Sequence, residues 1–106
     1  MIKNKIYGLI GLARRAGKIN FGTQSSIEAI EKRKAKLIIV TEDSAERTKK
    51  NFKILSENKN VPIRVYGNIE KMSESIGQTN KAVITINDEN FSNEIIKLID
   101  GGDVIG

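Results

Sequence analysis

Residues 37–60 read LIIVTEDSAERTKKNFKILSENKN, and they describe a buried strand followed at once by a helix. The four consecutive apolar residues LIIV are typical of a strand that is covered on both faces. In the polar stretch after them, Ala45, Thr48, Phe52 and Leu55 lie along one helical side. Asp43 with Glu46 can cap this helix, so residues 37–60 predict one strand–helix unit.

The same alternation continues towards the C-terminus. Strands are predicted at PIRVY (62–66) and AVITI (82–86), and helices at NIEKMSESI (68–76) and NFSNEIIKLI (90–99). Alternating strands and helices favour an α/β fold, a three-layer α/β/α sandwich with a small central mixed sheet. The tail GGDVIG (101–106) is expected to fray.

Two helices are predicted before the first strand. Apolar residues recur on one helical face over residues 2–13, and Gly17 is placed to end that helix. Residues 18–22 then form a short extended link, and a second helix begins at residues 23–25. At 106 residues in total, we expect a single domain spanning residues 1–106.

The composition excludes several classes of site. The chain has no cysteine and no histidine, so disulfides, thiolate or imidazole nucleophiles and most zinc sites are excluded. We therefore expect neither a metal nor another cofactor. The sequence shows no signal peptide and no apolar run of membrane length, so we expect a cytoplasmic protein without a membrane partner.

Positive charge is concentrated in the first half of the chain. Residues 1–50 hold 12 Lys and Arg against 5 Asp and Glu, whereas residues 51–106 hold 6 against 8. Such asymmetry indicates a polyanionic partner, because Lys and Arg that neutralise phosphates release condensed counterions. A solvated surface without a ligand is the alternative interpretation.

The segment GLARRAGKINFGTQSS (11–26) is the candidate binding site. It combines cations with a predicted helix start, whose free N–H groups favour phosphate, and Ser25 with Glu28 fits a capping box there. The alternative is a helix end, a capping box and solvated charges that bind nothing. The candidate RNA-contacting residues in and near this segment are Arg14, Arg15, Lys18, Gly22, Thr23, Gln24, Ser25, Lys32 and Lys34.

Enzyme interpretations are weak, and we expect no catalytic activity. The glycines of GLIGLARRAG (8–17) lie inside or after a helical pattern, whereas a dinucleotide fingerprint needs them between a strand and a helix. Glu42 and Asp43 follow a strand, where acids can be catalytic, but a helix cap explains them better. No residues mark a nucleophile–base pair.

The stretch GLARRAGKINFGTQSSIEAIEKRKAKLIIVTED (11–43) resembles the opening of the L-seven-A-e ribosomal protein family. The later blocks VPIRVY (61–66), NIEKMSESIG (68–77) and AVITI (82–86) follow in the same order, and the likeness is closest to the bacterial YlxQ-type members. The resemblance implies the sandwich fold and binding to a kink-turn or similarly bent structured RNA, possible association with the ribosome, and no DNA partner. We expect a monomer.

The resemblance also implies which residues contact RNA. Gln24 and Ser25 stand where the family has an Asn and a Glu that contact sheared G·A pairs, and Glu28 stands at a family lysine. The second contact is the loop before the last strand, which is more polar here than in the family and consists of Gly77, Gln78, Thr79, Asn80 and Lys81. A non-catalytic protein-interaction module of the same fold, using the helix faces around Arg47, Lys49 and Lys50, is the alternative function.

Overall fold

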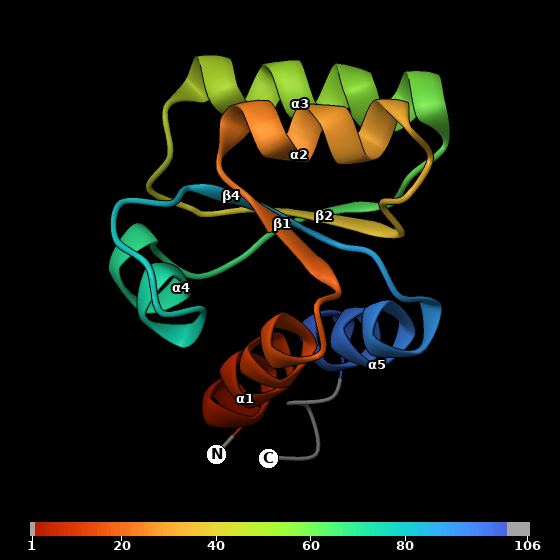
Figure 1. The fold of residues 1–106 in the computed structure, drawn as a ribbon. Coiled ribbons are helices and arrows are strands. Elements are labelled where there is room, and N and C mark those ends of the chain that lie inside the picture. The colour runs from red at the N-terminus through yellow and green to blue at the C-terminus, as the bar shows by residue number, and fades with distance from the viewer. Residues whose placement is uncertain (1, 102–106) are drawn as a thin grey trace.

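The computed structural model describes residues 2–101, with the side chains of residues 5–101. Helices and strands alternate along the described chain, and a short strand separates the first two helices, where only an extended link was predicted (Figure 1). The elements are α1 (Ile2–Arg15), β1 (Ile19–Phe21), α2 (Thr23–Glu31), β2 (Leu37–Val40), α3 (Glu46–Lys59), β3 (Ile63–Val65), α4 (Ile69–Ser75), β4 (Val83–Ile86) and α5 (Glu89–Asp100).

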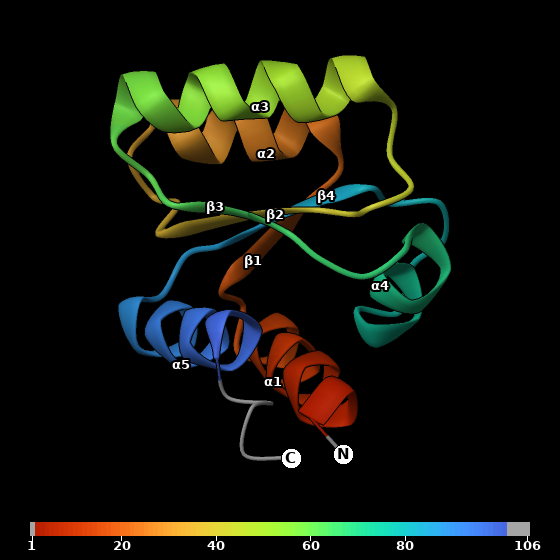
Figure 2. The ribbon, with the colours of Figure 1, turned by 180° about the vertical axis from the view of Figure 1, so that it is seen from behind.

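The four strands form one mixed sheet in the order β1-β4-β2-β3. β4 is antiparallel to both of its neighbours, whereas β2 and β3 are parallel. Helices α2 and α3 lie on one side of this sheet, and α1, α4 and α5 lie on the other (Figures 1 and 2). The predicted three-layer sandwich with a small mixed sheet is therefore confirmed.

The central strands are buried on both faces, so their side chains alternate between two apolar clusters. Leu37 and Ile39 face the layer of α1, α4 and α5, where Ile10 and Ile95 are fully buried. The other face of β2 packs with Phe52 and further residues of the α2–α3 layer. Continuous burial explains why β2 reads as an uninterrupted apolar run in the sequence, and why the buried Thr85 is the one polar residue of β4.

β1 was expected to be an extended link, but it pairs with β4 as an edge strand. Asn20 lies opposite Thr85, and the backbone bonding continues beyond the strand where the Gly22 N–H donates to the Val83 carbonyl at 2.9 Å. A strand of three residues, all half-buried, has no apolar run that periodicity could detect.

Two predicted helix caps were wrong. Helix α3 begins at Glu46 behind Ala45, and Asp43 instead accepts the backbone N–H of Ile69 at 3.0 Å, at the start of α4. Helix α2 begins at Thr23 without a side-chain cap, so Ser25 is not an N-cap. Both side chains bond to partners other than the helix ends they were expected to cap.

Of the predicted tail, residues 102–106 lie outside the described residues. Within residues 2–101, no helix combines the length and the apolar character that a membrane crossing requires.

Candidate nucleic-acid interface

Pairing of β1 with β4 brings two distant segments of the chain to one corner of the sheet. β1 leads directly into α2, and antiparallel β4 begins beside the point where β1 ends. The start of α2 and the connection from α4 to β4 therefore lie at the same end of the sheet (Figure 1). We call residues 22–25 and 77–81 together the corner.

The first turn of α2 supplies backbone donors to the corner. Ser26 is the first residue whose N–H reaches a carbonyl of the turn, that of Gly22 at 3.0 Å. The N–H groups of Thr23, Gln24 and Ser25 therefore lack an intrahelical acceptor. Gly22 precedes the helix with φ of 89°, a conformation that other residues rarely adopt, and it has no side chain to cap these donors. The helix start is open to an anion.

A buried hydroxyl holds the other half of the corner. Ser73 is 2% exposed, and its Oγ accepts the N–H of Lys81 at 2.8 Å. The Gln78 N–H donates to the Ser73 carbonyl at 2.8 Å, so both ends of the loop are tied to one residue of α4. Asn80 adopts a left-handed conformation with φ of 56°, and Thr79 and Asn80 are exposed. This loop presents polar groups from a fixed backbone.

Two cations flank the ring of Phe21 next to the corner. Arg14 Cζ lies 5.2 Å from the ring centroid, and Lys81 Nζ lies 5.7 Å from it. Attraction between cations and the face of an aromatic ring stabilises such an arrangement. Arg14 Nε is buried and has no hydrogen-bond partner within the described part of the chain. Phe21 therefore holds positive charge from α1 and from the loop beside Gly22.

A chain of side-chain hydrogen bonds positions Ser25. Asn20 Nδ2 donates to Ser25 Oγ at 2.7 Å, and Asn87 Nδ2 donates to Asn20 Oδ1 at 2.6 Å. Thr85 Oγ1 completes the chain by donating to Asn87 Oδ1 at 3.0 Å. Because Ser25 Oγ accepts from Asn20, its own hydroxyl hydrogen remains available for another acceptor.

The model of one protein family matches this chain over residues 4–96, and its description is "Ribosomal protein L7Ae/L30e/S12e/Gadd45 family". The chain belongs to this family. The resemblance inferred from the sequence is thereby confirmed.

Two curated relatives cover almost the whole chain. The "RNA-binding protein YlxQ" of Bacillus subtilis (strain 168) is 32% identical over 94 residues, which are 89% of this chain and 94% of that protein. The protein of the same name from Enterococcus faecium is 36% identical over 99 residues, which are 93% of this chain and 95% of that protein.

Solved structures share the fold. "The structure of a protein with unknown function from Bacillus halodurans C" has a TM-score of 0.87 at 30% identity and covers 91% of this chain and 97% of its own. The "Giardia lamblia 15.5kD RNA binding protein" has a TM-score of 0.76 at 16% identity, with 99% and 90% covered. At 16% identity, the likeness to the second structure shows a shared fold.

The residues singled out from the sequence of this L7Ae-type chain do not all lie at the corner. Most of them lie at the corner, namely Gly22, Thr23, Gln24 and Ser25 at the start of α2 and Gly77, Gln78, Thr79 and Asn80 in the loop before β4. Arg14 lies nearby, at the ring of Phe21. Lys32 and Lys34 follow the other end of α2, about 13 Å away for a nine-residue helix. The Lys18 carbonyl accepts the N–H of Asn87, beyond the far end of β4. Arg15 is exposed in the last turn of α1.

Sequence reasoning passed over Phe21 and Asn20, and it named Lys81 only as part of the loop. Their roles depend on contacts between β1 and the distant loop or β4, which spacing along the chain does not reveal. The alternation in INF (19–21) was the one available signal, since it places Asn20 on the face opposite Ile19 and Phe21. Within residues 5–101, no group of three or more Asp and Glu side chains is arranged to hold a metal ion.

Proposed function

We propose that this protein binds a kink-turn or a similarly bent structured RNA at the corner and performs no catalysis there. The observation that carries the proposal is the meeting of the open start of α2 with the polar loop and Lys81 in a chain of the L7Ae family. Both named relatives are RNA-binding proteins, which supports an RNA partner.

The corner suits an RNA that folds sharply. Bending presses phosphates together, and their repulsion favours the extended form. Cations and helix N–H groups at the corner would interact more strongly with the crowded phosphates, so binding would shift the population towards the bent state. Arg14 and Lys81 supply attraction independent of sequence, whereas Thr23, Gln24 and Ser25 supply side-chain groups that read base edges.

The test is a folding assay on the RNA itself. A kink-turn RNA with a fluorescent donor and acceptor on its two arms is titrated with protein at low ionic strength and without Mg²⁺. We expect energy transfer to rise on binding, and a plain duplex of equal length to bind more weakly. Equal affinity for both RNAs, with no rise in energy transfer, would contradict the proposal.

Further properties extend this proposal. We infer a single domain over residues 1–106, because the chain covers nearly all of each curated relative. A cytoplasmic monomer that associates with the ribosome agrees with an RNA-binding role. Sedimentation of the purified protein and of cell lysate tests the oligomeric state and the ribosome association separately.

A second candidate function is the protein-interaction module, which one observation favours. Val65 on edge strand β3 is 48% exposed, and it lines a groove with Ile63 and the lysines Lys49, Lys50 and Lys53 of α3. Crosslinking in cells followed by sequencing of bound RNA discriminates the two functions. The interaction module predicts no enriched RNA, whereas the RNA-binding function predicts one defined structured site.

A further inference from the structure

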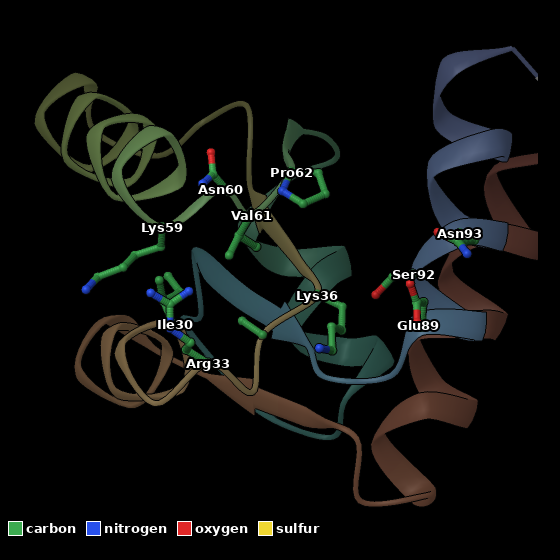
Figure 3. A pocket seen from close by; sticks show the side chains of 11 residues that line it. Ile30, Arg33, Lys36, Lys59, Asn60, Val61, Pro62, Glu89, Ser92 and Asn93 are labelled. Carbon is green, nitrogen blue, oxygen red and sulfur yellow. The ribbon is translucent and has the colours of Figure 1, made fainter.

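A second positively charged surface lies at the end of the molecule opposite the corner. It surrounds a pocket of about 350 Å³ between the end of α2, the end of α3 and the start of α5 (Figure 3). Three cations line this pocket, namely Arg33 and Lys36 from the connection between α2 and β2, and Lys59 from the last turn of α3. The RNA-binding corner does not include them.

The backbone fixes the positions from which these cationic side chains extend. Arg33 adopts a left-handed conformation with φ of 62°, and its N–H donates to the Ile30 carbonyl at 3.1 Å. The Lys36 N–H donates to the Ile86 carbonyl at 2.8 Å, which anchors Lys36 to the end of β4. The pocket therefore gathers charge from segments that the sheet and a tight turn hold in place.

The charge in the pocket is not neutralised. Within residues 5–101, none of the three cations has a carboxylate within 4.0 Å, since the ion pairs found there are Lys49–Glu46 and Arg64–Asp100. Glu89 is the only carboxylate in the lining, so the formal charge is two units positive. The buried apolar side chain of Ile30 forms part of the wall, and a low-dielectric wall focuses this field on an anion.

Neighbouring residues extend the positive surface beyond the pocket. Lys32 and Lys34 are exposed on the same connection as Arg33. Lys18 flanks the end of β4 on the side opposite Lys36, because its carbonyl accepts the N–H of Asn87 at 2.7 Å. A single small anion does not require charge spread this widely, whereas a chain of phosphates does.

We propose that this pocket and its rim bind backbone phosphates in an arm of the same RNA, outside the bend held at the corner. The inference rests on the proposed function, and it makes the protein a two-point clamp with one contact at the start of α2 and the other beyond its end. Arg33, Lys36 and Lys59 contact phosphates without reading sequence. Glu89 opposes binding at the same site.

The experiment compares three RNAs, namely the bent motif with a short arm, the same motif with a long arm, and a plain duplex. The test variant is Arg33→Asn, Lys36→Gln, Lys59→Gln, in which Asn suits the left-handed position. The matched control removes three exposed cations elsewhere by Arg47→Gln, Lys53→Gln and Lys97→Gln. Melting curves establish that both variants are folded.

For the wild type, we expect the long arm to increase affinity and to steepen the dependence of log K on log salt. The test variant should lose that gain and reduce the slope by about 2 to 3, close to one unit per lost phosphate contact. The control variant should keep most of the gain in affinity and most of the salt slope. Glu89→Gln should strengthen long-arm binding, and this opposite sign cannot result from unfolding.

Three outcomes would overturn the inference. An unchanged slope in the test variant on both long-arm RNA and duplex removes the pocket from the RNA footprint. If the control variant loses as much affinity and slope as the test variant, the cations act only through general electrostatic attraction. Saturable binding of inorganic pyrophosphate at the pocket without any long-arm effect assigns it to a small ligand. The corner's preference for bent over plain RNA is measured with the short arm, so failure of the proposed function remains distinguishable.

Discussion

Gln24 is the side chain at the corner best suited to read an RNA base. It is exposed on the first turn of α2, and its amide offers a donor and an acceptor together. We expect Gln24→Ala to weaken binding to bent RNA by about 1 kcal/mol and to leave duplex binding nearly unchanged. Competition binding with both RNAs measures the ratio. Asn51→Ala, an exposed amide on α3, is the control, and equal losses on both RNAs would remove Gln24 as a reader.

Glu28 places a negative charge one turn beyond Gln24. It is exposed on α2, where phosphates of an RNA held at the corner would pass. Removing a like charge should strengthen binding, so Glu28→Gln is expected to raise affinity roughly threefold, with a larger effect at low salt. Glu57→Gln on α3 is the matched control. A lower affinity for the Glu28 variant would show that the carboxylate itself contacts RNA.

At the residue scale, the sequence predicted the chemistry of the site better than its hydrogen bonds. Gly22 and Gln24 were singled out, and they lie at the open start of α2. The caps assigned to Ser25 and Asp43 failed because each side chain bonds elsewhere, Ser25 to Asn20 on the neighbouring strand β1 and Asp43 to the N–H of Ile69, 26 residues away. Local spacing cannot distinguish a local from a distant partner.

At the scale of elements, the connection from α4 to β4 depends on one buried hydroxyl. Ser73→Ala leaves the Lys81 N–H without its acceptor, which should cost about 1–3 kcal/mol of unfolding free energy. Denaturant unfolding measures this loss, and faster hydrogen exchange at Lys81 would locate it. Ser75→Ala is the control, since Ser75 Oγ donates only to the Met72 carbonyl of its own helix. Similar losses in both variants would contradict an anchoring role for Ser73.

Edge strand β3 is tied to the end of α5 by a two-pronged ion pair. Arg64 Nε and Nη2 donate to the two carboxylate oxygens of Asp100, each at 2.8 Å. The hydrogen bond from Arg64 lowers the pKa of Asp100 below its ordinary value of 3.8. The contribution to stability is therefore present above pH 3.8 and disappears as the pH falls through the lowered pKa.

Asp100→Asn should accordingly destabilise the protein near neutral pH. The pair is partly exposed, so we expect a loss of at most about 1 kcal/mol. The difference between wild type and variant should shrink as the pH falls below 3.8. Unfolding curves across this range measure it, and a difference that stays constant with pH would contradict an ionic origin.

The elements that the sequence predicted best are those with a strong apolar pattern. β2 was recognised as a continuous apolar run, β4 as a strand, and α5 as a helix with one apolar side. β1 was missed because three half-buried residues carry too little pattern. Its pairing with β4 nevertheless assembles the corner, so the element hardest to predict determines the site.

At the scale of the whole molecule, the excess of positive charge divides between two ends. The sequence indicated that the first half is basic, with 12 Lys and Arg in residues 1–50. It could not show that α2 separates these cations, because charge counting ignores the direction of a helix. Arg14 lies beside the corner, whereas Arg33 and Lys36 lie at the opposite pocket.

The most direct test of RNA binding at the corner is a map of backbone amide signals in the ¹⁵N-labelled protein during titration with a kink-turn RNA. If the corner binds RNA, the largest shifts fall on residues 22–25 and 77–81, with smaller shifts around Arg33 and Lys59 when the RNA arm is long. The exposed surface of α3 near Arg47 should stay unchanged. Shifts concentrated on that surface, or none at low ionic strength, would contradict the claim that the corner binds RNA.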